Sequence, residues 1–250
     1  MKIDLNCDMG EAPEAIANGA QEEIMPYLTS VNIAGGGHAG DEASIAATVE
    51  QAKRHGLAVG AHPGYPDRAN FGRLAMEMSP EEIAETVWRQ VRSVADAAAQ
   101  QGMRLRHVKP HGALYNSAAV RRDIAQAIAE GVGRWGREVA LVGLAGSVML
   151  EVFREAGFAV AAEAFADRRY EADGSLRARR FEDALIHDPV TAAQQVVEMV
   201  ERGRVRAVDG TWVPVQAETI CIHGDTSGAR EIAAAVRQAL ERHGVQVSGL

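Results

Sequence analysis

The stretch NIAGGGHAGD, residues 32–41, decides between the α/β folds that this chain could adopt. Gly35, Gly37 and Gly40 have the spacing G-x-G-x-x-G, follow an apolar run and open a helical pattern, as in a dinucleotide-binding loop. That loop also needs an acidic residue at the end of the second strand, where this chain has His62. A P-loop is excluded too, because none of the three lysines follows a glycine. We therefore interpret the glycines as turn residues that leave space beside the histidine among them.

Short apolar runs alternate with helical patterns along the rest of the chain. Seven such units predict an α/β protein with a parallel sheet wrapped in helices, and the absence of a Pro/Gly/Ser-rich linker predicts a single domain over residues 1–250. Uninterrupted alternation favours a closed β/α barrel. The predicted strands are KIDLNCD (2–8), SVNIA (30–34), GLAVGAH (56–62), LRHVKPH (105–111), VALVGL (139–144), FAVAAEAF (158–165) and ETICIHG (218–224), and the predicted helices lie near 21–28, 41–55, 80–101, 118–135, 146–156, 189–202 and 227–243.

One segment, VRAVDGTWVPV (residues 205–215), departs from this alternation. Two β-rich runs flank Asp209 and Gly210, and this dipeptide is a strong signal for a tight turn between antiparallel strands. The sequence therefore predicts a small β-hairpin inserted before the last barrel strand.

Composition excludes several classes of protein. The net charge is −8 and no Lys/Arg cluster forms a binding stripe, so no nucleic-acid partner is expected. No apolar run approaches the length of a membrane span, and the first residues do not resemble a signal peptide. Cys7 and Cys221 lie in apolar runs and are expected to be buried thiols of a reducing compartment. We expect a soluble, cytoplasmic protein with a small-molecule ligand.

The eight histidines of the chain differ in their local context. In a parallel barrel all strand C-termini open on one face, where such folds carry their chemistry. Four histidines end predicted strands, have a glycine one or two residues later, and are therefore expected to meet at this mouth: His38, His62, His111 and His223. His55 and His243 end charged helices, where the helix dipole favours them. His187 is expected in a surface loop.

Polar residues of the first strand, IDLNCD, alternate with apolar ones. By the two-residue period of a strand, Asp4, Asn6 and Asp8 share the face that points into the barrel. For Asp4 and Asn6 an internal polar network and a functional role are equally well supported. Asp8 and Glu11 lie nearest the mouth, which favours a function for both.

The segment HVKPH, residues 107–111, shows the same alternation. It places His107, Lys109 and His111 on one face, and a lysine inside a barrel needs an acidic partner. Asp8 or Asp41 could supply that partner. Asp41 is equally well explained as an acidic residue at the start of a helix.

The segment EAFADRRY, residues 163–170, ends another strand with charged side chains. Its arginines, Arg168 and Arg169, are candidates for bidentate binding of a carboxylate or phosphate, with Glu163 nearby. The neighbouring Arg177, Arg179 and Arg180 stay unassigned.

Five motifs carry a resemblance to a known family: DLNCDMGE, NIAGGGHAGD, GAHPGYPDRANFGR, VKPHGALYN and ICIHGDT. They occur in order over essentially the whole chain, which resembles the LamB/YcsF family, the A subunits of the prokaryotic 5-oxoprolinase. The resemblance implies a distorted seven-stranded β/α barrel of the glycoside hydrolase/deacetylase type. It further implies ATP-dependent opening of 5-oxo-L-proline to L-glutamate, with ATP and Mg²⁺ as cofactors and subunits B and C as partners.

These observations give a hypothesis for the site. Asp8 or Asp41, with a nearby histidine, is the base that activates water, while Lys109 and a strand-end histidine stabilise negative charge. The predicted catalytic residues are Asp8, His38, Asp41, His62, Lys109 and His111, and the predicted substrate-binding residues are Asn6, Glu11, Glu163, Arg168, Arg169, His223 and Asp225.

Two other function classes stay open. The first is a metal-dependent hydrolase or deacetylase of a carbohydrate or amide, in which Asp8, His38 and His62 hold the ion. The second is a non-catalytic subunit that binds a lactam or a sugar. The sequence also leaves open whether ATP binds this chain or its partner subunits.

Overall fold

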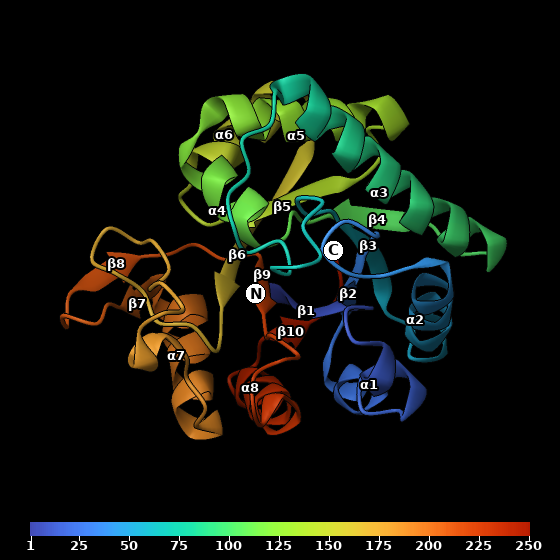
Figure 1. Ribbon diagram of the computed structural model, residues 1–250. Coiled ribbons are helices and arrows are strands. Elements are labelled where there is room, and N and C mark those ends of the chain that lie inside the picture. The colour runs from blue at the N-terminus through green and yellow to red at the C-terminus, as the bar shows by residue number, and fades with distance from the viewer.

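A closed barrel of seven parallel strands forms the centre of the molecule, as predicted. The computed structural model describes residues 1–250, and Figure 1 shows the strands enclosed by helices. The barrel closes where the last strand pairs with the first, with Asp4 opposite Thr219 and Asn6 opposite Cys221. In order around the barrel the strands are β1 (Lys2–Met9), β2 (Ser30–Ala34), β3 (Ala58–His62), β4 (Leu105–Val108), β5 (Ala140–Leu144), β6 (Ala159–Phe165) and β9 (Thr219–Cys221).

The predicted hairpin is confirmed. Strands β7 (Arg204–Arg206) and β8 (Trp212–Pro214) pair antiparallel around Asp209 and Gly210, between β6 and β9 in the chain. The barrel pairing of β6 with β9 passes over this insertion, and the hairpin projects at the edge of the molecule (Figure 1). A short strand that was not predicted, β10 (Gln246–Val247), pairs with the beginning of β1.

Helices surround the barrel, with α3 and α5 on one side and α7 and α8 on the opposite side (Figure 1). None of them combines the length and the apolar composition that crossing a bilayer requires. One prediction was wrong in detail, because the helix expected at 118–135 is two helices that meet at the extended residue Arg121. The helices are α1 (Pro13–Ala17), α2 (Glu42–Arg54), α3 (Pro80–Gln100), α4 (Gly112–Val120), α5 (Arg122–Trp135), α6 (Val148–Glu155), α7 (Pro189–Arg202) and α8 (Ala229–Arg242), with 3₁₀ turns η1 (Glu22–Tyr27) and η2 (Glu182–Ala184).

The barrel interior is polar, because the alternation of β1 turns its acidic and amide side chains inward. Asn6 Nδ2 donates to Glu163 Oε1 at 3.0 Å and to Thr219 Oγ1 at 2.7 Å. Deeper in the barrel, Asp4 accepts hydrogen bonds from Ser30 and Thr219. Burial raises the pKa of Asp4 although its hydrogen bonds oppose this effect. Asp4 and Asn6 therefore belong to an internal network that supports the barrel from within.

A glycine on β3 makes room for part of this network. A methyl group at Gly60 would overlap the imidazole of His107, which is fixed by a 2.7 Å contact between its Nε2 and Asn32 Oδ1. We predict that Gly60→Ala lowers the free energy of unfolding by about 1–3 kcal/mol, as overpacking does in other cores. Gly136→Ala is the matched control, because that position has φ 174° and open space around it. Urea unfolding of both variants measures the difference, and equal stability would contradict the packing argument.

Candidate active site at the barrel mouth

A pocket of about 940 Å³ opens at the C-terminal ends of the barrel strands. Most of the predicted functional residues line it, and they come from several strand ends: Asp8 near the end of β1 and Glu11 after it, His62 at the end of β3, Lys109 and His111 after β4, Arg168 after β6, and His223 and Asp225 after β9. Separate strands therefore deliver these side chains to one cavity, as barrel geometry requires.

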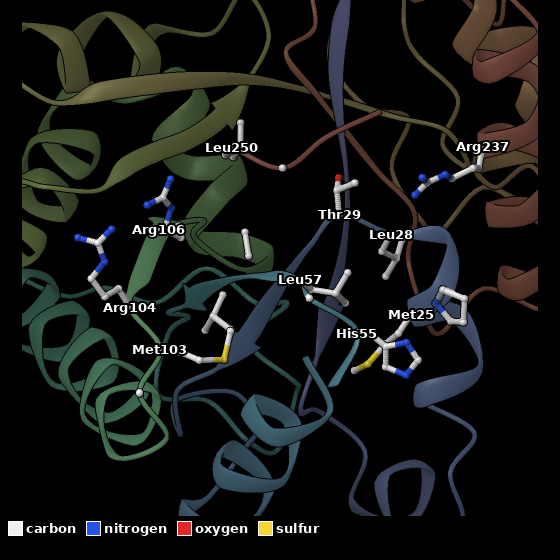
Figure 2. Close-up of a pocket in the computed structure, with 16 residues that line it drawn as sticks. Met25, Leu28, Thr29, His55, Leu57, Met103, Arg104, Arg106, Arg237 and Leu250 are labelled. Atoms are coloured by element: carbon white, nitrogen blue, oxygen red, sulfur yellow. The ribbon is translucent and has the colours of Figure 1, made fainter. Parts of the chain in front are cut away.

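A second pocket, of about 660 Å³, lies at the other end of the barrel (Figure 2). Its lining comes from the loops that precede β2, β3 and β4, together with the end of the chain at Leu250. Arg104, Arg106 and Arg237 border it, and no aspartate or glutamate side chain does. Of these two pockets, only the one at the mouth is lined by both carboxylates and histidines.

Lys109 is the central cation of the mouth. Its Nζ lies 2.9 Å from Asp8 Oδ1 and 2.9 Å from Glu163 Oε1, and all three side chains are buried or nearly so. Burial disfavours the ammonium, but the neighbouring carboxylates outweigh it and hold the pKa of Lys109 well above its usual value. Burial would likewise raise the pKa of Asp8, yet His62 and Lys109 hold it well below the usual range. An ionised carboxylate thus faces the pocket beside a fixed ammonium.

Three of the predicted histidines form one cluster. His38 stacks on His111 with ring centroids 3.6 Å apart, and His62 lies edge-on to both rings. Burial is the main cause that lowers the pKa of His38 to about 3 and holds the pKa of His111 well below its usual value. Glu11 Oε1 lies 2.9 Å from His38 Nε2 and 3.4 Å from His111 Nδ1. The stacked rings of His38 and His111 are therefore neutral imidazoles that face the half-buried carboxylate of Glu11.

The fourth histidine lies on the opposite wall of the pocket. His223 Nδ1 is 2.9 Å from Asp167 Oδ1, and its ring stacks on Phe165. Burial opposes the charge of Asp167, but His223 and further hydrogen bonds lower the pKa of this carboxyl group. Arg168 is also buried here, which lowers its pKa to about 10. Arg168 donates to the carbonyl oxygen of Arg177 at 2.6 Å, and its Nε has no partner.

Five predicted site residues do not line the pocket. Asp41 is the N-cap of α2, where its carboxylate accepts from the helix backbone in a capping box. Asn6 and Glu163 lie beneath the pocket within the internal network. Arg169 is partly exposed and lies outside the lining. His38 is buried within the histidine cluster, behind the residues that form the wall.

The interpretations of the remaining histidines are confirmed. His55 and His243 are the C-caps of α2 and α8, and His187 is exposed between η2 and α7. Both cysteines are free and buried. Cys221 points into the barrel, where Lys109 Nζ donates to its Sγ at 3.1 Å.

The glycine loop packs against a helix instead of opening toward a ligand. The amide of Gly37 donates to Gln90 Oε1 on α3 at 3.2 Å, and the amide of Gly36 donates to the carbonyl of Ala39. Methyl groups at Gly35 and Gly37 would overlap Gln90. The glycines therefore allow a tight turn and a close helix contact, as their interpretation as turn residues predicts.

Sequence reasoning missed three residues that line the mouth pocket or contact the segments around it. Asp167 contacts His223. It lies two residues after β6, and the same position just after a strand was the reason for predicting the other site residues. Tyr115 lines the pocket from α4, a helix that was not separated from α5 in the sequence. Gln90 lies in the middle of α3, and no local pattern distinguishes it from the other polar residues of that helix.

Comparisons with known proteins agree with this architecture. The family model for the LamB/YcsF family matches residues 3–250. The A subunit of a 5-oxoprolinase from Chloroflexus aggregans is 52% identical over 247 residues, which cover 99% of this chain and 98% of that protein. The corresponding protein from Thermococcus onnurineus is 46% identical, with coverage of 99% and 97%. The crystal structure of a lactam utilization protein from Thermus thermophilus is similar with a TM-score of 0.92, 45% identity and complete coverage of both chains.

Proposed function

Because this chain belongs to the LamB/YcsF family, we propose that it opens the ring amide of 5-oxo-L-proline as one component, the A subunit, of a 5-oxoprolinase. Its relatives over the full length are named as A subunits of this enzyme. The observation that carries the proposal is the buried pair of Asp8 and Lys109 in the floor of the mouth pocket. This pair combines a proton acceptor with a fixed positive charge, the two groups that hydrolysis of an amide needs.

A five-membered lactam is a stable amide, so ATP is used to activate it. Transfer of the γ-phosphoryl group to the lactam oxygen gives an imidate phosphate and ADP. Water then adds to the ring carbon, the C–N bond breaks, and the ring nitrogen leaves as the amine of an acyl phosphate. A second water releases phosphate and L-glutamate. In this scheme Asp8 accepts the proton of the attacking water, and Lys109 stabilises the negative charge on the tetrahedral carbon's oxygen.

We place the phosphoryl transfer on the partner subunits B and C, with Mg²⁺ bound to the nucleotide there. The support is the glycine loop of this chain, because its amides at Gly36 and Gly37 already donate to acceptors within the protein and are not free to bind a phosphate. The N-terminus of α2 that follows the loop is likewise capped by Asp41.

Arg168 is our candidate for the carboxylate of 5-oxoproline. It lines the pocket, is 7% exposed and keeps an unpartnered Nε. A buried guanidinium with a free donor is well suited to bind a carboxylate. His223 and Asp225 border the same wall, where Asp225 Oδ2 pairs with Arg73 at 2.7 Å.

The test is glutamate release from 5-oxoproline and ATP by this chain reconstituted with subunits B and C. We expect glutamate, ADP and phosphate in equal amounts, and none when this chain is left out. Arg168→Gln is expected to raise KM for 5-oxoproline roughly 10–100-fold, as loss of a charged hydrogen bond to substrate does.

Arg169→Gln is the matched control, because Arg169 is adjacent to Arg168 in the chain but lies outside the pocket lining. Its KM is expected to equal that of the wild type. Substrate binding without glutamate formation in the complete mixture would instead support the non-catalytic lactam-binding alternative. Equal KM values for the two variants would remove Arg168 from the substrate site.

A further inference from the structure

Four side chains of ligand type converge on one point at the side of the mouth formed by the ends of β1, β2, β3 and β4. They are Glu11, His38, His62 and His111, and their nearest donor atoms all lie within 4.8 Å of one another. The closest pairs are His38 Nε2 with Glu11 Oε1 at 2.9 Å, and His62 Nε2 with His111 Nδ1 at 3.0 Å. Donors bound tetrahedrally to Zn²⁺ stand roughly 3.3 Å apart, given bonds of about 2.0–2.1 Å. The cluster therefore has the dimensions of a metal site.

The hydrogen bonds of two rings fix which nitrogens carry protons. His62 Nδ1 lies 2.7 Å from the carbonyl oxygen of Lys109, and His111 Nε2 lies 2.9 Å from the carbonyl oxygen of Phe71. A carbonyl only accepts, so each of these nitrogens is the N–H donor of its ring. The nitrogens that face each other, His62 Nε2 and His111 Nδ1, are therefore left with lone pairs. Lone pairs 3.0 Å apart repel unless a cation, either a proton or a metal ion, lies between them.

These carbonyl contacts are also the outer contacts that metal-binding histidines make. Such a ring usually donates its second N–H to a carbonyl or carboxylate, which fixes its orientation. His62 and His111 meet this condition. His38 is oriented by its stacking on His111 instead, because its Nδ1 has no partner.

The charges of the mouth favour a metal ion over a single proton. Three buried or nearly buried carboxylates, those of Asp8, Glu11 and Glu163, lie around the cluster and Lys109. Lys109 pairs with Asp8 and Glu163 and balances one of the three charges, while no lysine or arginine pairs with Glu11. A divalent cation beside Glu11 would balance the other two.

A second group of side chains of ligand type, Asp8, Cys221 and His223, is less suited to bind a metal ion. The ammonium of Lys109 already contacts it, at 2.9 Å from Asp8 Oδ1 and 3.1 Å from Cys221 Sγ. The position that a metal ion would take there is thus next to a fixed positive charge.

We propose that Glu11, His38, His62 and His111 bind one divalent transition-metal ion, with Zn²⁺ the best fit to three imidazoles and one carboxylate in a tetrahedral arrangement. This set differs from the one predicted from sequence, because Glu11 and His111 take the place of Asp8. Glu11, His62 and His111 line the mouth pocket, so an ion there would lie in the pocket wall with all four of its tetrahedral positions filled by this chain. The proposal does not depend on the ring-opening activity.

The test uses the purified chain alone, without substrate or partner subunits. After treatment with a chelator it is titrated with ZnCl₂ in a calorimeter. We expect one ion per chain, and a rise of the unfolding midpoint by about 5–10 °C at a hundredfold excess over Kd. Absence of stoichiometric binding would overturn the proposal and leave a shared proton between His62 and His111.

X-ray absorption at the zinc edge of the loaded wild-type chain identifies the ligands even if variants fold poorly. We expect four nitrogen or oxygen ligands with imidazole scattering. A sulfur ligand would place the ion at Cys221 and contradict the proposed set.

Substitutions then locate the site. Glu11→Gln and His38→Gln are expected to weaken Zn²⁺ binding at least about 100-fold, more than changes in outer contacts do. The matched controls are Glu14→Gln and His187→Gln, because both residues are exposed. Wild-type affinity in Glu11→Gln and His38→Gln would show that only adventitious ions bind elsewhere on the chain.

Discussion

Replacing Lys109 with methionine is expected to abolish glutamate release and to lower the free energy of unfolding by about 3–5 kcal/mol, the usual cost of breaking a buried ion pair. The reason is that Lys109 is the cation for two carboxylates, Asp8 and Glu163, and Glu163 is fully buried. A methionine fills a similar volume but removes the ammonium that balances both carboxylates. Urea unfolding and the reconstituted assay measure the two effects on the same preparation.

Lys53→Met is the control for this substitution. Lys53 is exposed on α2 and its ammonium contacts only the carbonyl oxygen of Gln101. Its replacement should change the free energy of unfolding by no more than about 0.5 kcal/mol. If Lys109→Met were as stable and as active as Lys53→Met, the central role of the buried ammonium would be wrong.

Asp8→Asn is expected to lower kcat by a factor of about 10²–10⁴ while the far-UV spectrum stays unchanged. Asparagine has the shape of aspartate, and Glu163 remains as a partner of Lys109, so the barrel keeps its packing. What is lost is the ionised oxygen that accepts a proton from water. Because the contribution is made in the transition state, kcat and kcat/KM should fall together.

Asp41→Asn provides the comparison, since the sequence alone assigned the base to either aspartate. Asp41 caps α2, and asparagine is an equally good N-cap residue. We expect wild-type turnover and wild-type stability from this variant. A kcat for Asp8→Asn within about threefold of that of Asp41→Asn would remove Asp8 from the role of base.

The fold could be predicted because its signals are periodic. Alternation in IDLNCD fixed the inward face of β1, and Asp209-Gly210 located the hairpin. The division of residues 112–135 into two helices could not be predicted, because no proline or glycine stands at Arg121. The short helix α1 was missed as well, since five residues carry too little periodicity.

The site could be predicted only as far as strand ends. The positions of His62, His111 and His223 follow from barrel geometry. Barrel geometry does not determine which of two adjacent arginines faces the pocket. The backbone after β6 is irregular, so that Arg168 lines the pocket while Arg169 is partly exposed outside it. The side chain of Glu11 depends on a turn at Gly10, whose φ of 77° no pattern in the sequence specifies.

The hairpin β7–β8 has a consequence for how such a protein can diversify. Val213, Pro214 and Val215 border the mouth pocket, together with residues 172–176 of the preceding loop. Neither segment belongs to the barrel, and the pairing of β6 with β9 does not pass through them. One wall of the cavity is therefore built from segments that can vary without disturbing the barrel, while Asp8 and Lys109 lie on or next to barrel strands. Evolution can reshape the ligand that fits without rebuilding the machinery that acts on it.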